Sequence, residues 1–86
     1  MLGDLTVIGR DGDCELPLDD PRVSGRHAQV RKARGQWLFL DLESRNGSFL
    51  CNDGTSRRIR ASHTLADNDE IRVGDTILKF IEMRGR

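Results

Sequence analysis

Short alternating segments separated by frequent turn signals constrain the fold of this chain most. Apolar and polar residues alternate, or strand-forming residues cluster, at 5–8, 28–31, 36–42, 58–60, 70–73 and 76–81. Between them lie the turn-forming groups Asp11-Gly12-Asp13, Asp19-Asp20-Pro21, Arg34-Gly35, Asn46-Gly47, Asn52-Asp53-Gly54, Asp67-Asn68-Asp69 and Gly74-Asp75. No stretch shows a helical face of any length. The pattern predicts an all-β fold, a sandwich or barrel of short antiparallel strands.

The length predicts one domain, over residues 1–86, with a thin core. A chain of this size has room for a binding surface made of loops, but hardly for a deep substrate cavity. No apolar run is long enough for a membrane span or a signal-peptide core, so we expect a cytoplasmic protein without a membrane partner.

The charges narrow the choice of partner. Fourteen basic and fourteen acidic residues cancel, and the pI is near 6.7, which argues against nucleic-acid binding through bulk phosphate attraction. Only Lys32 and Lys79 are lysines, and arginine is the residue suited to gripping a planar or tetrahedral anion. Cys14 and Cys51 have neither metal-ligand spacing nor the number needed for a disulfide framework. We expect no metal and two reduced thiols.

Four polar motifs lie where predicted strands begin or end, the last of them after a further strand that follows residue 47. They are Gly9-Arg10, Ser24-Gly25-Arg26-His27, Ser44-Arg45-Asn46-Gly47 and Asn52-Asp53-Gly54. In this order and spacing they resemble the forkhead-associated (FHA) domain family, whose pattern is Gly-Arg, then Ser-x-x-His, then Asn-Gly. The resemblance runs from residue 5 to about residue 80. It implies a β-sandwich with binding loops at one end, which binds phosphothreonine peptides and needs no cofactor.

The resemblance implies a phosphate site built from Arg10 and Ser24. A phosphothreonine carries nearly two negative charges and three acceptor oxygens, so its site needs a fixed cation and neutral donors. Arg10 supplies the cation, and Gly9 lets the backbone before it turn tightly. Ser24 offers a hydroxyl donor, although a serine here also suits a turn cap. Arg26 is either a second cation at the rim or a surface charge.

His27 lies near Ser24 in the sequence, but the pair does not indicate a catalytic site. A nucleophile needs a base, a third group that orients the base and an oxyanion site, and the sequence supplies no such set. The resemblance gives His27 a buttressing role, in which it hydrogen-bonds the loops that carry Arg10 and Ser24. We therefore expect a binding module and not an enzyme.

The sequence predicts two roles for Asn46 and Gly47, a turn and a peptide contact, and the two roles are compatible. Asn-Gly is the commonest two-residue hairpin turn, because both residues tolerate positive φ. The resemblance instead makes the Asn46 carboxamide a ligand for the peptide main chain, supported by Gly47 in the loop. Arg22, two positions before Ser24, is then expected to contact a residue that follows the phosphothreonine.

The chain departs from the family pattern in two places. Arg45 replaces the usual threonine before the asparagine, so its side chain either adds a phosphate contact or points away and removes the threonine contact. The family also has one or two strands before the Gly-Arg, whereas only eight residues precede Gly9. We expect an open strand edge, either because the chain is a fragment or because a partner chain or a second copy covers it.

Recruitment of threonine-phosphorylated proteins in kinase signalling is the function that this reading favours. The alternative is an FHA-fold scaffold without phosphate recognition, which joins proteins through a sheet face or its open edge.

Overall fold

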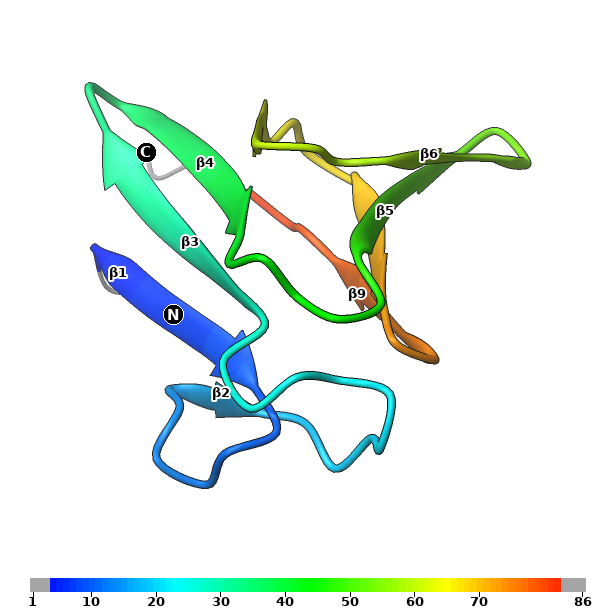
Figure 1. Ribbon diagram of the computed structural model, residues 1–86. Coiled ribbons are helices and arrows are strands. Elements are labelled where there is room, and N and C mark those ends of the chain that lie inside the picture. Colours follow the sequence, from blue (N-terminus) through cyan, green and yellow to red (C-terminus); the bar gives the residue numbers. More distant parts are fainter. Residues whose placement is uncertain (1–3, 83–86) are drawn as a thin grey trace.

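The computed structural model describes residues 4–82 and contains two β-sheets that face each other (Figure 1). The strands are β1 (Leu5–Gly9), β2 (Leu16–Pro17), β3 (Ala28–Ala33), β4 (Gln36–Asp41), β5 (Ser48–Asn52), β6 (Thr55–Arg58), β7 (Ser62–Thr64), β8 (Glu70–Val73) and β9 (Thr76–Lys79). One sheet has the order β2-β1-β3-β4-β7 and the other the order β6-β5-β8-β9. Every pairing is antiparallel except that of β1 with β2. The predicted antiparallel β-sandwich is confirmed, and residues 4–82 contain no helix.

Two tight hairpins close the end of the sandwich at which β4 begins and β5 finishes. Arg34 and Gly35, between β3 and β4, have φ values of 54° and 77°. Asp53 and Gly54, between β5 and β6, have φ values of 55° and 77°. Positive φ at both central residues is the geometry of a type I′ turn, whose twist matches that of the flanking strands. These turn signals therefore have the role that the sequence predicts.

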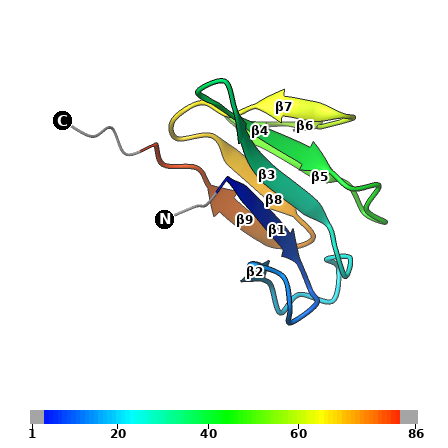
Figure 2. The same cartoon turned by 90° about the vertical axis from the view of Figure 1, so that its left-hand side faces the viewer.

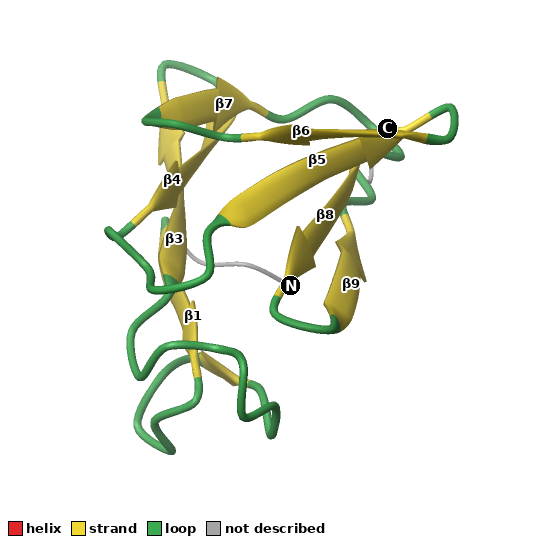
Figure 3. Ribbon diagram, turned by 45° about the vertical axis from the view of Figure 1, so that its right-hand side comes forward, coloured by secondary structure: helices red, strands yellow, loops and turns green. Residues whose placement is uncertain are grey.

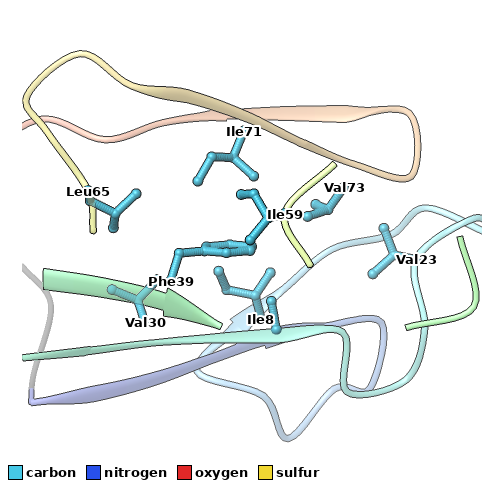
Figure 4. Close-up of a cluster of buried hydrophobic side chains, with 9 residues drawn as sticks. Ile8, Val23, Val30, Phe39, Ile59, Leu65, Ile71 and Val73 are labelled. Atoms are coloured by element: carbon cyan, nitrogen blue, oxygen red, sulfur yellow. The ribbon is translucent and has the colours of Figure 1, made fainter. Parts of the chain in front are cut away.

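The core lies between the sheets and is filled by the inward residue of each alternating pair (Figure 4). Phe39 at its centre is 1% exposed, and Trp37, on the same face of β4, packs against the cluster of buried residues. The other buried members are Ile8, Val23, Ala28, Val30, Ile59, Leu65, Ile71 and Val73.

Three details of the strands differ from the sequence prediction. The edge strands β2 and β7 were not predicted, because neither has an alternating apolar face. β6 begins at Thr55, directly after its hairpin turn, and ends at Arg58. Ile59 leaves the strand, donates its N–H to the carbonyl of Ser48 (2.8 Å) and buries its side chain in the core.

One side of the sandwich is open. Within the described range β9 pairs only with β8, and β2 covers β1 only at Ile8 and Gly9. A cleft of about 300 Å³ lies between these edges and is lined mainly by apolar side chains, among them Ile8, Phe39 and Leu78. Ile81 at its margin is 51% exposed.

The chain passes between the two sheets three times, and the first passage lies at the end opposite the two hairpins. The 42–47 segment joins β4 to β5, and the loops 10–15 and 18–27 lie at the same end (Figure 3). As for membrane insertion, no helix of sufficient length and hydrophobicity to span a bilayer occurs in residues 4–82.

Candidate functional site

Hydrogen bonds join the three loops at this end into one surface. Arg10 donates its backbone N–H to the carbonyl of Ser24 (3.0 Å), which ties the 10–15 loop to the 18–27 loop. Arg45 donates its backbone N–H to Ser24 Oγ (3.0 Å), and Asn46 Nδ2 donates to the carbonyl of Arg22 (2.8 Å). The structure thus brings together Arg10, Ser24, Arg45, Asn46 and Arg22, which lie up to 36 positions apart in the sequence.

Gly9 permits the close approach of the first two loops. A Cβ atom at this position would collide with the carbonyl oxygen of Gly25 and would lie 3.0 Å from the Cα of Arg26. Gly9 does not have a positive φ and lies within β1, so the reason predicted for it, a tight turn, is wrong. What the fold requires here is the absence of a side chain.

His27 lies beneath the site and is fully buried, at 0% exposure. Its Nδ1 accepts a hydrogen bond from the N–H of Ser24 (3.0 Å), so Nε2 carries the proton and donates it to the carbonyl of Gly47 (2.9 Å). The backbone carbonyl of His27 also accepts a bond from the N–H of Leu42 (2.9 Å). One side chain therefore links the 18–27 loop to the 42–47 loop.

This geometry leaves His27 no role as a base toward Ser24. Both ring nitrogens are bonded to backbone groups, and the bond to Ser24 involves its N–H rather than its hydroxyl. The second histidine, His63, bonds Asp69 (2.9 Å) far along the chain from these loops.

The carboxylate of Asp41 holds the 42–47 loop in place through hydrogen bonds. Ser44 donates its hydroxyl to Asp41 Oδ1 (2.6 Å) and its N–H to Oδ2 (2.9 Å), and Ser48 donates its hydroxyl to Oδ1 (2.6 Å). Ser44 Oγ in turn accepts the N–H of Gly47 (2.9 Å). Burial by itself raises the pKa of Asp41, but the hydrogen bonds from Ser44 and Ser48 outweigh it and hold this pKa below its ordinary value.

Gly47 has φ = 83°, whereas Asn46 is not in the left-handed region. Because β4 and β5 belong to different sheets, Asn46-Gly47 is not a hairpin turn, and that reading is wrong.

Asp20 fixes the 18–27 loop against the β8–β9 turn. It is 6% exposed and accepts bonds from Thr76 Oγ1 (2.7 Å), Asp75 N–H (2.8 Å) and Arg22 N–H (2.9 Å). The bond from Thr76 contributes most to a pKa of Asp20 below its ordinary value. The sequence did not reveal this role, because the partners lie 55 and 56 residues away.

Arginine side chains surround the joined loops. Arg10, Arg26 and Arg45 are exposed, and within residues 4–82 no carboxylate lies within ion-pair distance of them. Arg26 faces the 10–15 loop: burial raises the pKa of the Cys14 thiol, and the charge of Arg26 opposes that rise. Arg22 differs, since its Nε lies 3.5 Å from Asp75 Oδ2 in an exposed pair.

The surface therefore presents unneutralised cations beside neutral donors. Ser24 Oγ accepts a bond from Arg45, which leaves its own proton for an external acceptor. Asn46 uses its Nδ2 on Arg22, and the structure records no bond to its Oδ1 within the described residues. Such a set suits an anion with several acceptor oxygens. Cys14 and Cys51 are free thiols, and no cluster of possible metal ligands is present in residues 4–82.

Comparison with known proteins identifies a family that the chain matches. The family model of the FHA domain matches residues 6–74. The oxoglutarate dehydrogenase inhibitor of Corynebacterium diphtheriae is 36% identical over 77 residues, which cover 90% of this chain and 50% of the relative. The glycogen accumulation regulator GarA of Mycolicibacterium smegmatis is 36% identical over 76 residues, covering 88% of this chain and 45% of the relative. The chain thus spans about half the length of the curated relatives that it matches.

Solved structures agree with the sequence comparison. An FHA domain studied for phosphothreonine-dependent interactions superposes with a TM-score of 0.85 and 30% identity, over 98% of this chain and 82% of the other. The FhaA FHA domain, solved in complex with the intracellular domain of Rv3910, gives a TM-score of 0.77 and 32% identity over 90% and 79% of the two chains. In sequence and in three dimensions alike, this chain belongs to the FHA domain family.

Proposed function

We propose that this chain binds protein segments that carry phosphothreonine, and that it does so without catalysing a reaction. The observation that carries the proposal is the joining of Arg10, Ser24 and Arg45 into one surface by direct hydrogen bonds between their loops. The FHA domain with a TM-score of 0.85 was studied for phosphothreonine-dependent interactions, which supports the choice of ligand.

Arg10 is the fixed cation of the proposed phosphate site, and Ser24 donates its free hydroxyl proton to a phosphate oxygen. Hydrogen bonds to an ionised acceptor are about twice as strong as neutral ones, so these two contacts carry most of the phosphate affinity. Arg26 and Arg45 lie at the rim and strengthen the attraction through charge. Gly9, His27 and Gly47 hold the three loops at their spacing.

Asn46 is the proposed contact to the peptide main chain. Its Nδ2 is bonded to the carbonyl of Arg22, so its Oδ1 remains for an N–H of an extended peptide. Arg22 lies beside Asn46, and its charge is balanced by the nearby carboxylate of Asp75. This position suits recognition of a residue that follows the phosphothreonine.

The proposed role in the cell is recruitment of phosphorylated partners in kinase signalling within the cytoplasm. The curated relatives are named for inhibiting oxoglutarate dehydrogenase and for regulating glycogen accumulation, which supports a regulatory role through protein contacts.

Substitution of Arg10 tests the proposal directly. Arg10→Ala should cost about 2–5 kcal/mol of binding free energy for a phosphothreonine peptide, because it leaves the phosphate charge without its main partner. Calorimetric titration with phosphorylated and unphosphorylated forms of one peptide library measures the loss. Arg31→Ala, an exposed change on β3, is the matched control and should bind as the wild type does. Binding by Arg10→Ala within threefold of the wild type would remove Arg10 from the site.

Assembly through the open side of the sandwich is a second candidate function. The apolar cleft between β1 and β9, with Ile81 exposed at its margin, favours it. We propose that a second copy of the chain covers this side. Sedimentation equilibrium should then show a concentration-dependent dimer that Ile81→Asp abolishes. A monomer at all concentrations would contradict this second function and leave the phosphopeptide site unaffected.

A further inference from the structure

Two arginines on the outer face of the four-stranded sheet flank one aromatic ring. Phe49 of β5 stands opposite Arg58 of β6 on one side and opposite Arg72 of β8 on the other. Directly opposed residues in antiparallel strands share a face, and the neighbours of Phe49 point into the core, so this face is the outer one. We call Arg58, Phe49 and Arg72 the arginine row (its strands are labelled in Figure 3).

The arginine row is continuous with the candidate site. The guanidinium of Arg58 lies against the backbone of Gly47, since a Cβ built on Gly47 would be 3.0 Å from Nε and 3.2 Å from Cζ of Arg58. Gly47 follows Asn46 directly and accepts the hydrogen bond of His27 Nε2. Arg58 therefore borders the same loop that carries the proposed peptide contact.

The two cations of the row differ in how they are held. Arg72 is half-buried, with its Cζ 4.5 Å from the centre of the Phe49 ring, and its Nη1 donates to the carbonyl of Gly74 (3.4 Å). Arg58 is exposed, and in the part of the chain that the structure describes no carboxylate lies within ion-pair distance of either arginine. Along the sheet, Glu70 and Lys79 stand opposite each other, so the adjoining row is neutral. The arginine row is thus a local excess of positive charge.

Resting on the proposed function, we propose that Arg58, backed by Arg72, selects phosphothreonine segments that carry an acidic side chain near the phosphorylated residue. Continuity with the candidate loops makes the bound peptide the occupant of this surface, and the unneutralised charge makes an aspartate or glutamate its complement.

The spacing of the acidic residue follows from the chain geometry. Arg45 bonds Ser24, and Gly47 is two residues further along, so the Cα atoms of Arg45 and Gly47 are at most about 7 Å apart. An extended peptide advances about 3.3 Å per residue, and an arginine side chain adds reach. The acidic residue is therefore expected about two to four positions from the phosphothreonine.

A peptide series measures this selectivity. One phosphothreonine peptide with neutral flanks is compared by fluorescence anisotropy with versions carrying a single aspartate at each position two to four residues to either side. Wild type should bind one of the aspartate peptides about two- to fivefold more tightly than the neutral peptide, the range of an exposed ion pair. Arg58→Gln should lose this advantage, so that its affinities for the aspartate peptide and the neutral peptide become equal. Arg58→Glu should prefer the matching lysine peptide.

Arg57→Gln is the matched control, because Arg57 is the preceding residue of β6, is also exposed and lies outside the row. It should retain the preference for aspartate. Equal binding of all phosphorylated peptides by the wild type, or an aspartate preference that survives Arg58→Gln, would overturn the inference. If no phosphorylated peptide bound the wild type at all, the proposed function itself would fail, so the two failures are distinct.

Discussion

Gly9 shows how one missing side chain sets the distance between two loops. The end of β1 approaches the backbone of Gly25 so closely that no Cβ fits between them. The backbone bonds from Arg10 to Ser24 and from Asp11 to Gly25 (3.0 and 3.1 Å) depend on this approach. The position of the Arg10 side chain relative to Ser24 is therefore set by a residue that has no functional group.

Replacing this glycine should damage both stability and binding. Gly9→Ala should lower the free energy of unfolding by about 1–3 kcal/mol, because the backbone of the 18–27 loop has to shift to admit the methyl group. Gly12→Ala in the neighbouring 10–15 loop is the control: nothing lies within 4 Å of its Cβ position, so stability should stay equal or rise slightly. Thermal unfolding of both variants measures the difference. Equal melting temperatures for the two would contradict the close approach.

At the scale of elements, the 42–47 segment matters most for the site, because it carries Arg45 and Asn46 to the loops that hold Ser24. Its shape is set by Asp41 at the end of β4, which accepts three hydrogen bonds from Ser44 and Ser48. The carboxylate is buried on the inward face and stays ionised because these donors hold its pKa low, although burial alone acts to raise it.

The stability of the protein should therefore fall with acid in a way that depends on Asp41. Its pKa is lower in the folded than in the unfolded chain, so the stabilisation is complete above about pH 4 and is lost as the pH falls through the folded value. Asp41→Asn should unfold more easily at pH 7, by about 1–3 kcal/mol, because an amide nitrogen cannot accept a donor's proton. It should also lose less stability than the wild type between pH 5 and pH 3.

Melting curves across this pH range, with the exposed Asp19→Asn as control, provide the measurement. An acid profile of Asp41→Asn parallel to that of the wild type would mean that other carboxylates govern the loss.

The sequence pattern predicted the elements whose own residues specify them. Phe39 and its alternating neighbours predicted β4, and Asp53-Gly54 predicted a tight turn. The pattern did not predict β2 or β7, which pair at sheet edges without an apolar face and are specified by their neighbours. Edge strands of two or three residues carry too little periodicity to be recognised.

The same limit applies to the site. Arg10, Ser24 and Asn46 were recognisable because the family resemblance marks them, and the structure does bring them together. The supporting carboxylates Asp20 and Asp41 were not recognised as such, since each reads locally as an ordinary turn or strand-end residue. The sequence does contain one indication of a buried carboxylate: Asp41 lies on the same face of the predicted strand as Trp37 and Phe39.

At the scale of the whole molecule, a net charge of zero hides an uneven distribution. Arg10, Arg26 and Arg45 gather at the loop end without ion-pair partners in the described part of the chain, and Arg58 adjoins them. The electrostatic field that a ligand meets is therefore local. The salt dependence of phosphopeptide affinity then depends on which of these side chains face the ligand.

The salt dependence of binding can isolate the contribution of Arg45. If its side chain faces the ligand, as proposed, phosphopeptide affinity should fall less steeply with salt in Arg45→Ala than in the wild type, because one screened attraction is gone. Titrations at a series of sodium chloride concentrations give both slopes, and Arg31→Ala should keep the wild-type slope. Identical slopes for Arg45→Ala and the wild type would place this side chain outside the reach of the ligand.

Of the two type I′ hairpins, the one between β5 and β6 is suited to chemical attachment. β5 runs from Ser48, next to the binding loops, to Asn52, so the Asp53-Gly54 tip lies about 17 Å from that end. Nothing lies within 4 Å of the Cβ position of Gly54, and a short exposed tip of this kind tolerates inserted residues. A fluorophore or a surface linker attached at this tip would leave the opposite end free to capture ligand. Figure 2 shows β6 at the opposite end of the molecule from β2, so the β5–β6 hairpin is a suitable place for anchoring the protein in a sensor.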